Sequence, residues 1–316
     1  MEERGLVPHR LGNNIWCINP DYQASKPTIL LNSHIDTVKP VSGWSHQPFS
    51  PETEDDRIYG LGSNDAGASL VSLFQAFCQL STSKQDYNLI FLASCEEEIS
   101  GKNGIESVLP QLPPITMALV GEPTNMQPAI AEKGLMVLDV IAHGKAGHAA
   151  RNEGINAIYQ ALDDLSWFRD YRFAKESPLL GPVKMTVTVI QAGTQHNVIP
   201  DQCTFLVDVR SNECYTNEEL YEEICKHVKS EVKAHSFRLN SSRIDLQNPL
   251  VQRAIQLGKV PFGSPTLSDQ ALMNFPSLKM GPGSSSRSHS ADEFVCISEI
   301  DDAIQTYVSL LDGLKI

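Results

Sequence analysis

Histidine and carboxylate side chains stand at or just after the ends of several apolar runs in this sequence. Imidazole nitrogen and carboxylate oxygen are the ligands that zinc and similar divalent metals accept in mixed sites. The carboxyl ends of parallel strands meet at one edge of an α/β sheet, where ligands and catalytic groups gather. The sequence therefore predicts a metal site built from five segments, which supply His34 with Asp36, Asp65, the glutamate triplet 96–98, Glu122 and His289.

The charges of these side chains indicate how many metal ions the site holds. Asp65, Glu98 and Glu122 supply three negative charges, and a bridging hydroxide would supply the fourth that two Zn²⁺ ions require. His34 and His289 would complete the coordination as neutral imidazoles. A single ion would leave buried negative charge in surplus, which is costly. We therefore expect two metal ions that share one carboxylate, because five protein ligands are few for two separate tetrahedral sites.

The segments that position these residues alternate between strand and helix patterns up to about Lys133. The apolar runs 28–33 and 89–93 have the composition of buried strands in a parallel sheet. The same pattern resumes after about Asn240, so we expect an α/β layer fold in both parts of the chain. The helices expected in these parts are 68–80, 249–257 and 297–311.

Residues 134–243 show a different pattern. Three segments there alternate strictly between apolar and polar residues, as strands with one solvated face do. With two amphipathic helices, the order predicts a ferredoxin-like α+β module. His289 can return to the site only if this module is inserted into the catalytic domain. We therefore expect a first part of the catalytic domain at 1–133 and a second part of it at 244–316. The expected strands are 136–142, 183–190 and 203–209, and the expected helices are 155–168 and 218–232.

The composition argues against several classes of protein. A formal net charge of −13 is unsuited to binding nucleic acid or an anionic membrane. Seven cysteines, odd in number and without a Cys-x-x-Cys pair, favour free thiols in the cytoplasm. No apolar segment has the length of a signal peptide core or a membrane span. The nucleophile elbow, the His-Glu-x-x-His helix and the phosphate-binding loop are absent from the sequence.

Taken together, the motifs resemble those of the zinc-dependent aminoacylase and carboxypeptidase family that includes acetylornithine deacetylase and succinyl-diaminopimelate desuccinylase. The resemblance runs from about Asn14 to the C-terminus. It implies a zinc-peptidase-like mixed sheet flanked by helices, an inserted lid and dimerisation domain, and two Zn²⁺ ions for which Co²⁺ can substitute. The ligands that it implies are His34 and Glu122 for one ion, Glu98 and His289 for the other, and Asp65 as the bridge.

The resemblance also implies roles for residues close to the metals. Asp36 would fix the orientation of His34, and Glu97 would act as the general base. The family has an acidic residue followed by two glutamates, so the triplet could be aligned in either of two ways. We prefer the alignment in which Glu96 leads, Glu97 is the base and Glu98 is the ligand.

Three residues of the insert match functional positions of the family, one catalytic and two substrate-binding. His148 would reach into the site of a partner subunit of a homodimer and stabilise the oxyanion. Asn197 and Arg210 would hold the carboxylate and backbone of a small N-acyl amino acid. Relatives usually carry a helical segment before the first strand, whereas this sequence enters a strand almost at once, at 13–17, so its start is either late or trimmed.

Residues 60–68 and the motifs of the insert are most similar to those of acetylornithine deacetylases. The expected function is therefore removal of an acyl group, with acetyl preferred, from N-acetylornithine or a close analogue in arginine biosynthesis. The alternatives that stay open are an N-acetyl- or N-succinylcitrulline deacylase, a succinyl-diaminopimelate desuccinylase and a dipeptidase. A metal-dead dimeric scaffold is the non-enzyme alternative, against which the presence of all five ligands together with Glu97 argues.

Overall fold

The computed structural model describes residues 1–316 and divides into two compact units. The first unit comprises Met1–Ile130, Arg243–Gly263 and Ser268–Ile316, and the second comprises Ala131–Ser242 and Ser264–Leu267. The main segment of the second unit overlaps the insert expected at 134–243. The short segment Ser264–Leu267 also joins that unit, which the sequence pattern did not indicate. None of the helices has the length and apolar character that crossing a membrane requires.

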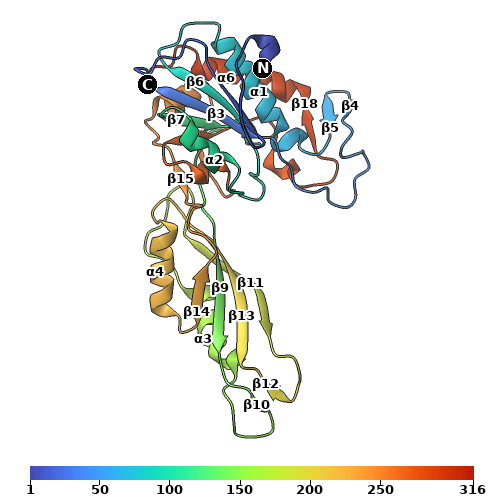
Figure 1. The fold of residues 1–316 in the computed structure, drawn as a ribbon, viewed down its shortest axis with the longest axis vertical. Helices are drawn as coiled ribbons and strands as arrows, with labels where there is room; N and C mark the ends of the chain where they lie inside the picture. The colour runs from blue at the N-terminus through green and yellow to red at the C-terminus, as the bar shows by residue number, and fades with distance from the viewer. The chain divides into compact units, whose positions relative to one another are not determined.

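A nine-stranded mixed sheet forms the centre of the first unit, in the order β1-β2-β6-β3-β7-β17-β8-β15, with β16 paired to β8. Its strands β6, β3 and β7 are labelled in Figure 1. Strands β6, β3, β7 and β17 run parallel, whereas β2 is antiparallel to β1 and β6, and β8 is antiparallel to β17. Every residue of β3 and β6 is buried, as in strands covered on both faces. The strands are β1 (His9–Leu11), β2 (Asn14–Ile18), β3 (Thr28–His34), β6 (Asn88–Ser94), β7 (Met117–Val120), β8 (Ala129–Glu132), β15 (Ser242–Arg243), β16 (Phe262–Ser264) and β17 (Ser277–Lys279).

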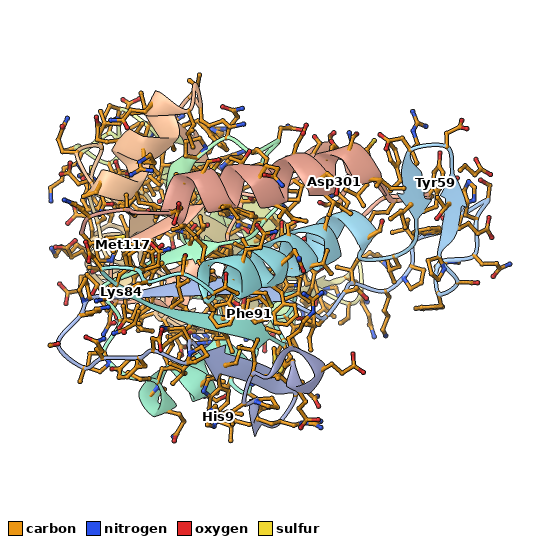
Figure 2. The ribbon with its side chains drawn as sticks, turned by 90° about the horizontal axis from the view of Figure 1, so that it is seen from above. His9, Tyr59, Lys84, Phe91, Met117 and Asp301 are labelled. Atoms are coloured by element: carbon orange, nitrogen blue, oxygen red, sulfur yellow. The ribbon has the colours of Figure 1, made fainter.

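Helices cover both faces of this sheet, because successive side chains of a strand point to opposite sides. In β3, Ile29 and Leu31 join the core beneath α1 and α6, whereas Leu30 joins the core on the face that α2 covers. Helices α1 and α6 lie side by side above the strands in Figure 2. The predicted α/β class is thus confirmed, and two expected helices have the predicted bounds. The helices are α1 (Ala68–Leu80), α2 (Ile105–Val108), α5 (Pro249–Gln256) and α6 (Ile297–Leu311).

The second unit contains a four-stranded antiparallel sheet in the order β11-β13-β9-β14. Along the chain the elements follow the order β9-α3-β11-β13-α4-β14, which is that of a ferredoxin-like module. A two-stranded ribbon, β10 with β12, extends this unit. The elements are β9 (Met136–His143), β10 (Gly147–His148), α3 (Ala157–Asp170), β11 (Lys184–Ala192), β12 (Val198–Ile199), β13 (Gln202–Arg210), α4 (Asn217–His227) and β14 (Glu231–Ala234).

One expected helix of the second unit, 218–232, is wrong at its C-terminal end. Helix α4 ends at His227, and the next residues turn into β14, where Val232 pairs with Val140. The buried carboxylate of Asp164 on α3 fixes this turn, because it accepts hydrogen bonds from the backbone N–H groups of Lys229 (3.1 Å) and Ser230 (2.9 Å). This contact between distant segments ends the helix, and no local sequence pattern predicts where the helix ends.

Candidate active site

The carboxyl ends of three neighbouring parallel strands supply much of the candidate site. His34 is the last residue of β3, the glutamate triplet follows β6 after Cys95, and Glu122 follows β7. Asp65 lies in the irregular segment Ser63–Gly67 ahead of α1. His289 lies in the loop before β18 (Phe294–Cys296). Residues more than 250 positions apart in the chain therefore meet at one sheet edge, as ligands of α/β sheets do.

These side chains form two groups that share one member. His34, Asp65 and Glu122 make the first group, and Asp65, Glu98 and His289 make the second; within each group the ligand atoms lie within 4.8 Å of one another. His34 Nε2 is 3.2 Å from Asp65 Oδ1 and 3.7 Å from Glu122 Oε1. His289 Nε2 is 3.1 Å from Glu98 Oε2 and 3.6 Å from Asp65 Oδ2. The two oxygens of Asp65 thus face different groups.

The electrostatics of Glu122 fit a bound cation. Its Oε1 atom is buried and accepts no hydrogen bond, although buried carboxylate oxygens are costly to leave without a partner. Burial raises the pKa of Glu122 to about 8, and the nearby Asp65 adds to the rise. A divalent cation would give this oxygen its missing partner and would balance the neighbouring charges. Mixed nitrogen and oxygen ligands suit zinc and other first-row metals.

Glu97 belongs to neither group, and it is held beside them. Burial raises the pKa of Glu97 well above its usual range, and the adjacent Glu122 raises it further. The carboxylate of Asp36 accepts the backbone N–H of Glu97 and that of Glu98, each at 3.2 Å. A carboxyl group that resists ionisation and lies outside the ligand groups has the properties of a proton carrier.

The contacts of Asp36 differ from those that we expected. His34 Nδ1 lies 2.9 Å from the backbone carbonyl oxygen of Asp36, whereas the Asp36 carboxylate is 3.6 Å away. The carboxylate also accepts two backbone N–H groups of the glutamate triplet. Asp36 therefore contacts His34 through its main chain and its side chain, and its side chain holds the triplet as well.

Glu96 points away from both groups. Its carboxylate accepts hydrogen bonds from the backbone N–H (3.1 Å) and the side-chain amide (3.1 Å) of Asn103, which closes a turn. Glu96 and His289 both have positive φ angles, 59° and 56°, which are uncommon for residues other than glycine. Such backbone strain is concentrated at functional sites.

Two buried acidic residues next to the groups were missed by the sequence analysis. Asp269 is fully buried, accepts a hydrogen bond from Ser94 Oγ at 2.6 Å, and has a pKa that burial raises to about 6. It lies in a short 3₁₀ turn without a strand pattern, so no sequence signal marks it. Glu293 accepts backbone hydrogen bonds from the segment that carries Asp65. The only feature of the sequence that points to Glu293 is its position four residues after His289.

The other three predicted site residues lie in the second unit. His148 forms part of β10, where its Nδ1 accepts the backbone N–H of Ala150 at 3.1 Å. Asn197 lies beside it, because its carbonyl oxygen accepts the N–H of Ala149 at 3.0 Å. Arg210 ends β13 and is paired bidentately with Asp208, at 2.8 and 3.0 Å. Within this unit, therefore, His148 and Asn197 come together on one ribbon, and Arg210 lies at the far end of the following strand.

Comparisons with known proteins point to one family. Residues 30–313 match the family described as Peptidase family M20/M25/M40. The succinyl-diaminopimelate desuccinylase of Wolbachia pipientis wMel is 28% identical over 250 residues, which cover 73% of this chain and 62% of that protein. The acetylornithine deacetylase of Vibrio parahaemolyticus is 29% identical over 308 residues, which cover 87% of this chain and 78% of that protein.

The match to the Wolbachia protein thus spans about three fifths of that relative's length. Among solved structures, the YXEP protein of Bacillus subtilis has the same fold, with a TM-score of 0.72 and 18% sequence identity. The alignment covers 99% of this chain and 90% of that one. The Bacillus protein is described as a dinuclear metal-binding peptidase of the M20 family.

The raised pKa of Glu122 predicts how the metal-free chain responds to pH. Between about pH 4.5 and 8 the folded state keeps a proton that the unfolded state has lost, so the free energy of unfolding falls as pH rises through this range. Glu122→Gln removes the titrating group, and its stability relative to wild type should increase by on the order of a few kcal/mol from pH 5 to pH 8.5.

Chemical denaturation in the presence of a chelator measures this difference. Glu222→Gln, which removes an exposed carboxylate from helix α4 of the second unit, is the control and should follow the wild-type pH dependence. If Glu122→Gln also followed the wild-type curve, the pKa of Glu122 would not be raised in the folded chain.

Proposed function

The chain belongs to the peptidase family M20/M25/M40, and on that basis we propose that it is a two-metal hydrolase that removes the acyl group from an N-acyl amino acid. The observation that carries the proposal is the position of Asp65, whose two oxygens face separate ligand groups. A carboxylate in that position is suited to bridge two metal ions. A metal-dead scaffold would need neither this arrangement nor the partly buried Glu97 beside it.

We assign the metal ligands by the two groups. His34 and Glu122 would hold one ion, Glu98 and His289 the other, and Asp65 both. When bound, two zinc ions would acidify the attacking water and polarise the amide carbonyl. The three ligand carboxylates and one hydroxide would balance the charge of both ions, and Co²⁺ has the same charge and can replace Zn²⁺.

Glu97 is the residue that would move protons. It would accept the proton of the attacking water on a carboxylate oxygen and later donate it to the departing amine nitrogen. Burial raises the pKa of Glu97 in the metal-free chain, and a carboxyl group of ordinary pKa would return the proton poorly near neutral pH. Asp36 would keep Glu97 in place through the hydrogen bond to its backbone N–H.

For the substrate we propose N-acetylornithine or a close analogue, in a cytoplasmic step of arginine biosynthesis. The likeness to acetylornithine deacetylases over most of the chain supports this choice. The likeness to a succinyl-diaminopimelate desuccinylase favours N-succinyl-diaminopimelate as the second candidate. Asn197 and Arg210 would bind the free carboxylate and backbone of the substrate. Arg210 would have to exchange its present partner, Asp208, for that carboxylate.

A panel of substrates tests the proposal directly. We expect N-acetylornithine to give the highest kcat/KM when compared with N-acetylcitrulline, the N-succinyl forms of both amino acids, N-succinyl-diaminopimelate and a dipeptide. If a succinyl compound or the dipeptide were the best substrate, the proposed substrate would be wrong, but the proposed hydrolysis of an amide bond would stand. Failure of the metal-loaded protein to cleave any amide of the panel would contradict the hydrolase itself.

The roles of two adjacent glutamates predict opposite effects of the same substitution. Glu97→Gln removes only the proton carrier, so it should retain both metal ions and lose about 10²–10⁴-fold in kcat. Glu98→Gln removes a ligand, so it should bind one of the two ions more weakly. Metal content after dialysis and steady-state kinetics measure both effects. The reverse pattern would mean that the triplet is aligned wrongly by one residue.

We further propose that the protein acts as a homodimer formed by its second unit. Strand β11 is an edge strand on which Ile190 is 53% exposed. Helix α3 exposes Tyr159 (68%) and Leu162 (51%) on the same unit. Exposed apolar side chains along an edge strand and a helix support a symmetric interface. In such a dimer His148 would complete the site of the partner subunit by stabilising the oxyanion.

Mixing two inactive variants tests this arrangement. A heterodimer of His148→Ala and Glu97→Gln chains would contain one site with both residues intact, so up to about half of the wild-type activity per heterodimer should return. Each variant alone serves as the control. If native mass spectrometry confirmed that subunits exchange and no activity returned, His148 would not act across subunits.

A further inference from the structure

The buried carboxylate of Glu293 accepts hydrogen bonds from the segment that carries Asp65. Only 2% of its surface is exposed. Its Oε2 accepts the backbone N–H of Gly62 at 3.0 Å, and its Oε1 accepts those of Asn64 at 3.0 Å and Asp65 at 2.9 Å. An ionised carboxylate only accepts hydrogen bonds, so it is matched to three converging N–H donors. Because Glu293 stands four residues after His289, these bonds join two segments of the candidate site.

Asn64, in the segment of Asp65, forms side-chain hydrogen bonds to the loop that leads to His289. Its side chain is fully buried. The amide nitrogen donates to the carbonyl oxygen of Ser284 at 3.1 Å and to Ser288 Oγ at 3.2 Å, and the amide oxygen accepts the N–H of Ser284 at 3.1 Å. The residue before Asp65 thus holds the loop that leads to His289, while Glu293, beyond that loop, holds Asp65.

The segment around Asp65 depends on these bonds because its own backbone is irregular. Gly62 has a φ of 76°, and Asp65, with φ −119° and ψ 95°, departs from helical geometry inside a short helical turn. Such a segment has no regular ladder of hydrogen bonds to fix it. A small rotation would move both carboxylate oxygens of Asp65, which face two different ligand groups. Metal ligands tolerate displacements of only about 0.5 Å.

We propose that Glu293 is a positioning residue that holds Asp65 in place for two metal ions, with Asn64 holding the His289 loop from the other side. This inference rests on the proposed two-metal function. Glu293 does not contact a metal or the substrate in this account, and it acts through the backbone of Asp65. Glu293→Gln keeps nearly the same side-chain size. It replaces one accepting oxygen with an NH₂ group, which would face a backbone N–H donor and cannot accept its hydrogen bond.

The test is Co²⁺ binding to metal-free protein, followed by calorimetry and by the visible absorption of the bound ion. Glu293→Gln should weaken Co²⁺ binding by about 10–100-fold, the usual effect of losing a residue that orients a ligand. Its absorption bands should also shift, because the coordination geometry changes. The free energy of unfolding of the metal-free variant shows whether the chain still folds.

The neighbouring Asp292 offers a matched control. Its carboxylate also accepts three hydrogen bonds, from the N–H and hydroxyl of Ser45 and the N–H of His46, but none from the Asp65 segment. Asp292→Asn should therefore leave Co²⁺ affinity and absorption unchanged. An equal loss of affinity in both variants would show that any damage to this loop weakens metal binding, which would overturn the proposal.

A double substitution separates positioning from general stability. In an Asp65→Asn background the shared ligand is already lost, so adding Glu293→Gln should weaken Co²⁺ binding far less than it does in wild type. Additive losses would overturn the proposal. Should Glu293→Gln fail to fold, Glu293→Asp replaces it, since it keeps the charge but cannot reach all three donors.

The outcomes for the two proposals differ. Wild-type protein that bound no Co²⁺ would overturn the two-metal function and this inference with it. Wild-type binding of two ions with unchanged affinity in Glu293→Gln would overturn only the role of Glu293.

Discussion

Repulsion among partly buried carboxylates is the interaction on which the rest of this structure depends. Asp65, Glu97, Glu98 and Glu122 converge at one sheet edge, and Asp269 lies close to them. Burial, together with the neighbouring negative charges, raises the pKa values of the three glutamates. Such a cluster is costly unless cations balance it. We therefore expect bound cations to stabilise this cluster relative to the metal-free chain.

Holding like charges together requires a rigid frame, and the chain supplies it at two levels. The parallel strands β3, β6 and β7 fix the origins of three ligand segments through fully buried backbones. Side chains that accept backbone N–H groups then fix the loops. Asp36 holds the segment of Glu97, and Glu293 holds that of Asp65. Both anchors are carboxylates, and backbone N–H donors stabilise their charge.

The sequence contained enough to predict the fold class and the side chains that gather at the sheet edge, because apolar runs with acidic or histidine residues at their ends are local signals. The division of these side chains into two groups was an expectation from the resemblance to a known family. It could not reveal what depends on contacts between distant segments. The end of α4 depends on Asp164, which is far away in the chain. The burial of Asp269 likewise comes from packing. For Asp36, the motif indicated a carboxylate beside His34, and only the folded structure shows that this carboxylate also holds the triplet.

The central claim is that Asp65 joins two metal ions in one site. Anomalous X-ray diffraction from crystals of the Zn²⁺-loaded protein, recorded on both sides of the zinc absorption edge, tests it most directly. The account predicts two anomalous peaks, each about 2.0–2.2 Å from a different oxygen of Asp65. One peak should have His34 and Glu122 as its other protein ligands, and the second should have Glu98 and His289. A single peak at saturating zinc, or two peaks of which one has no contact with Asp65, would contradict the account.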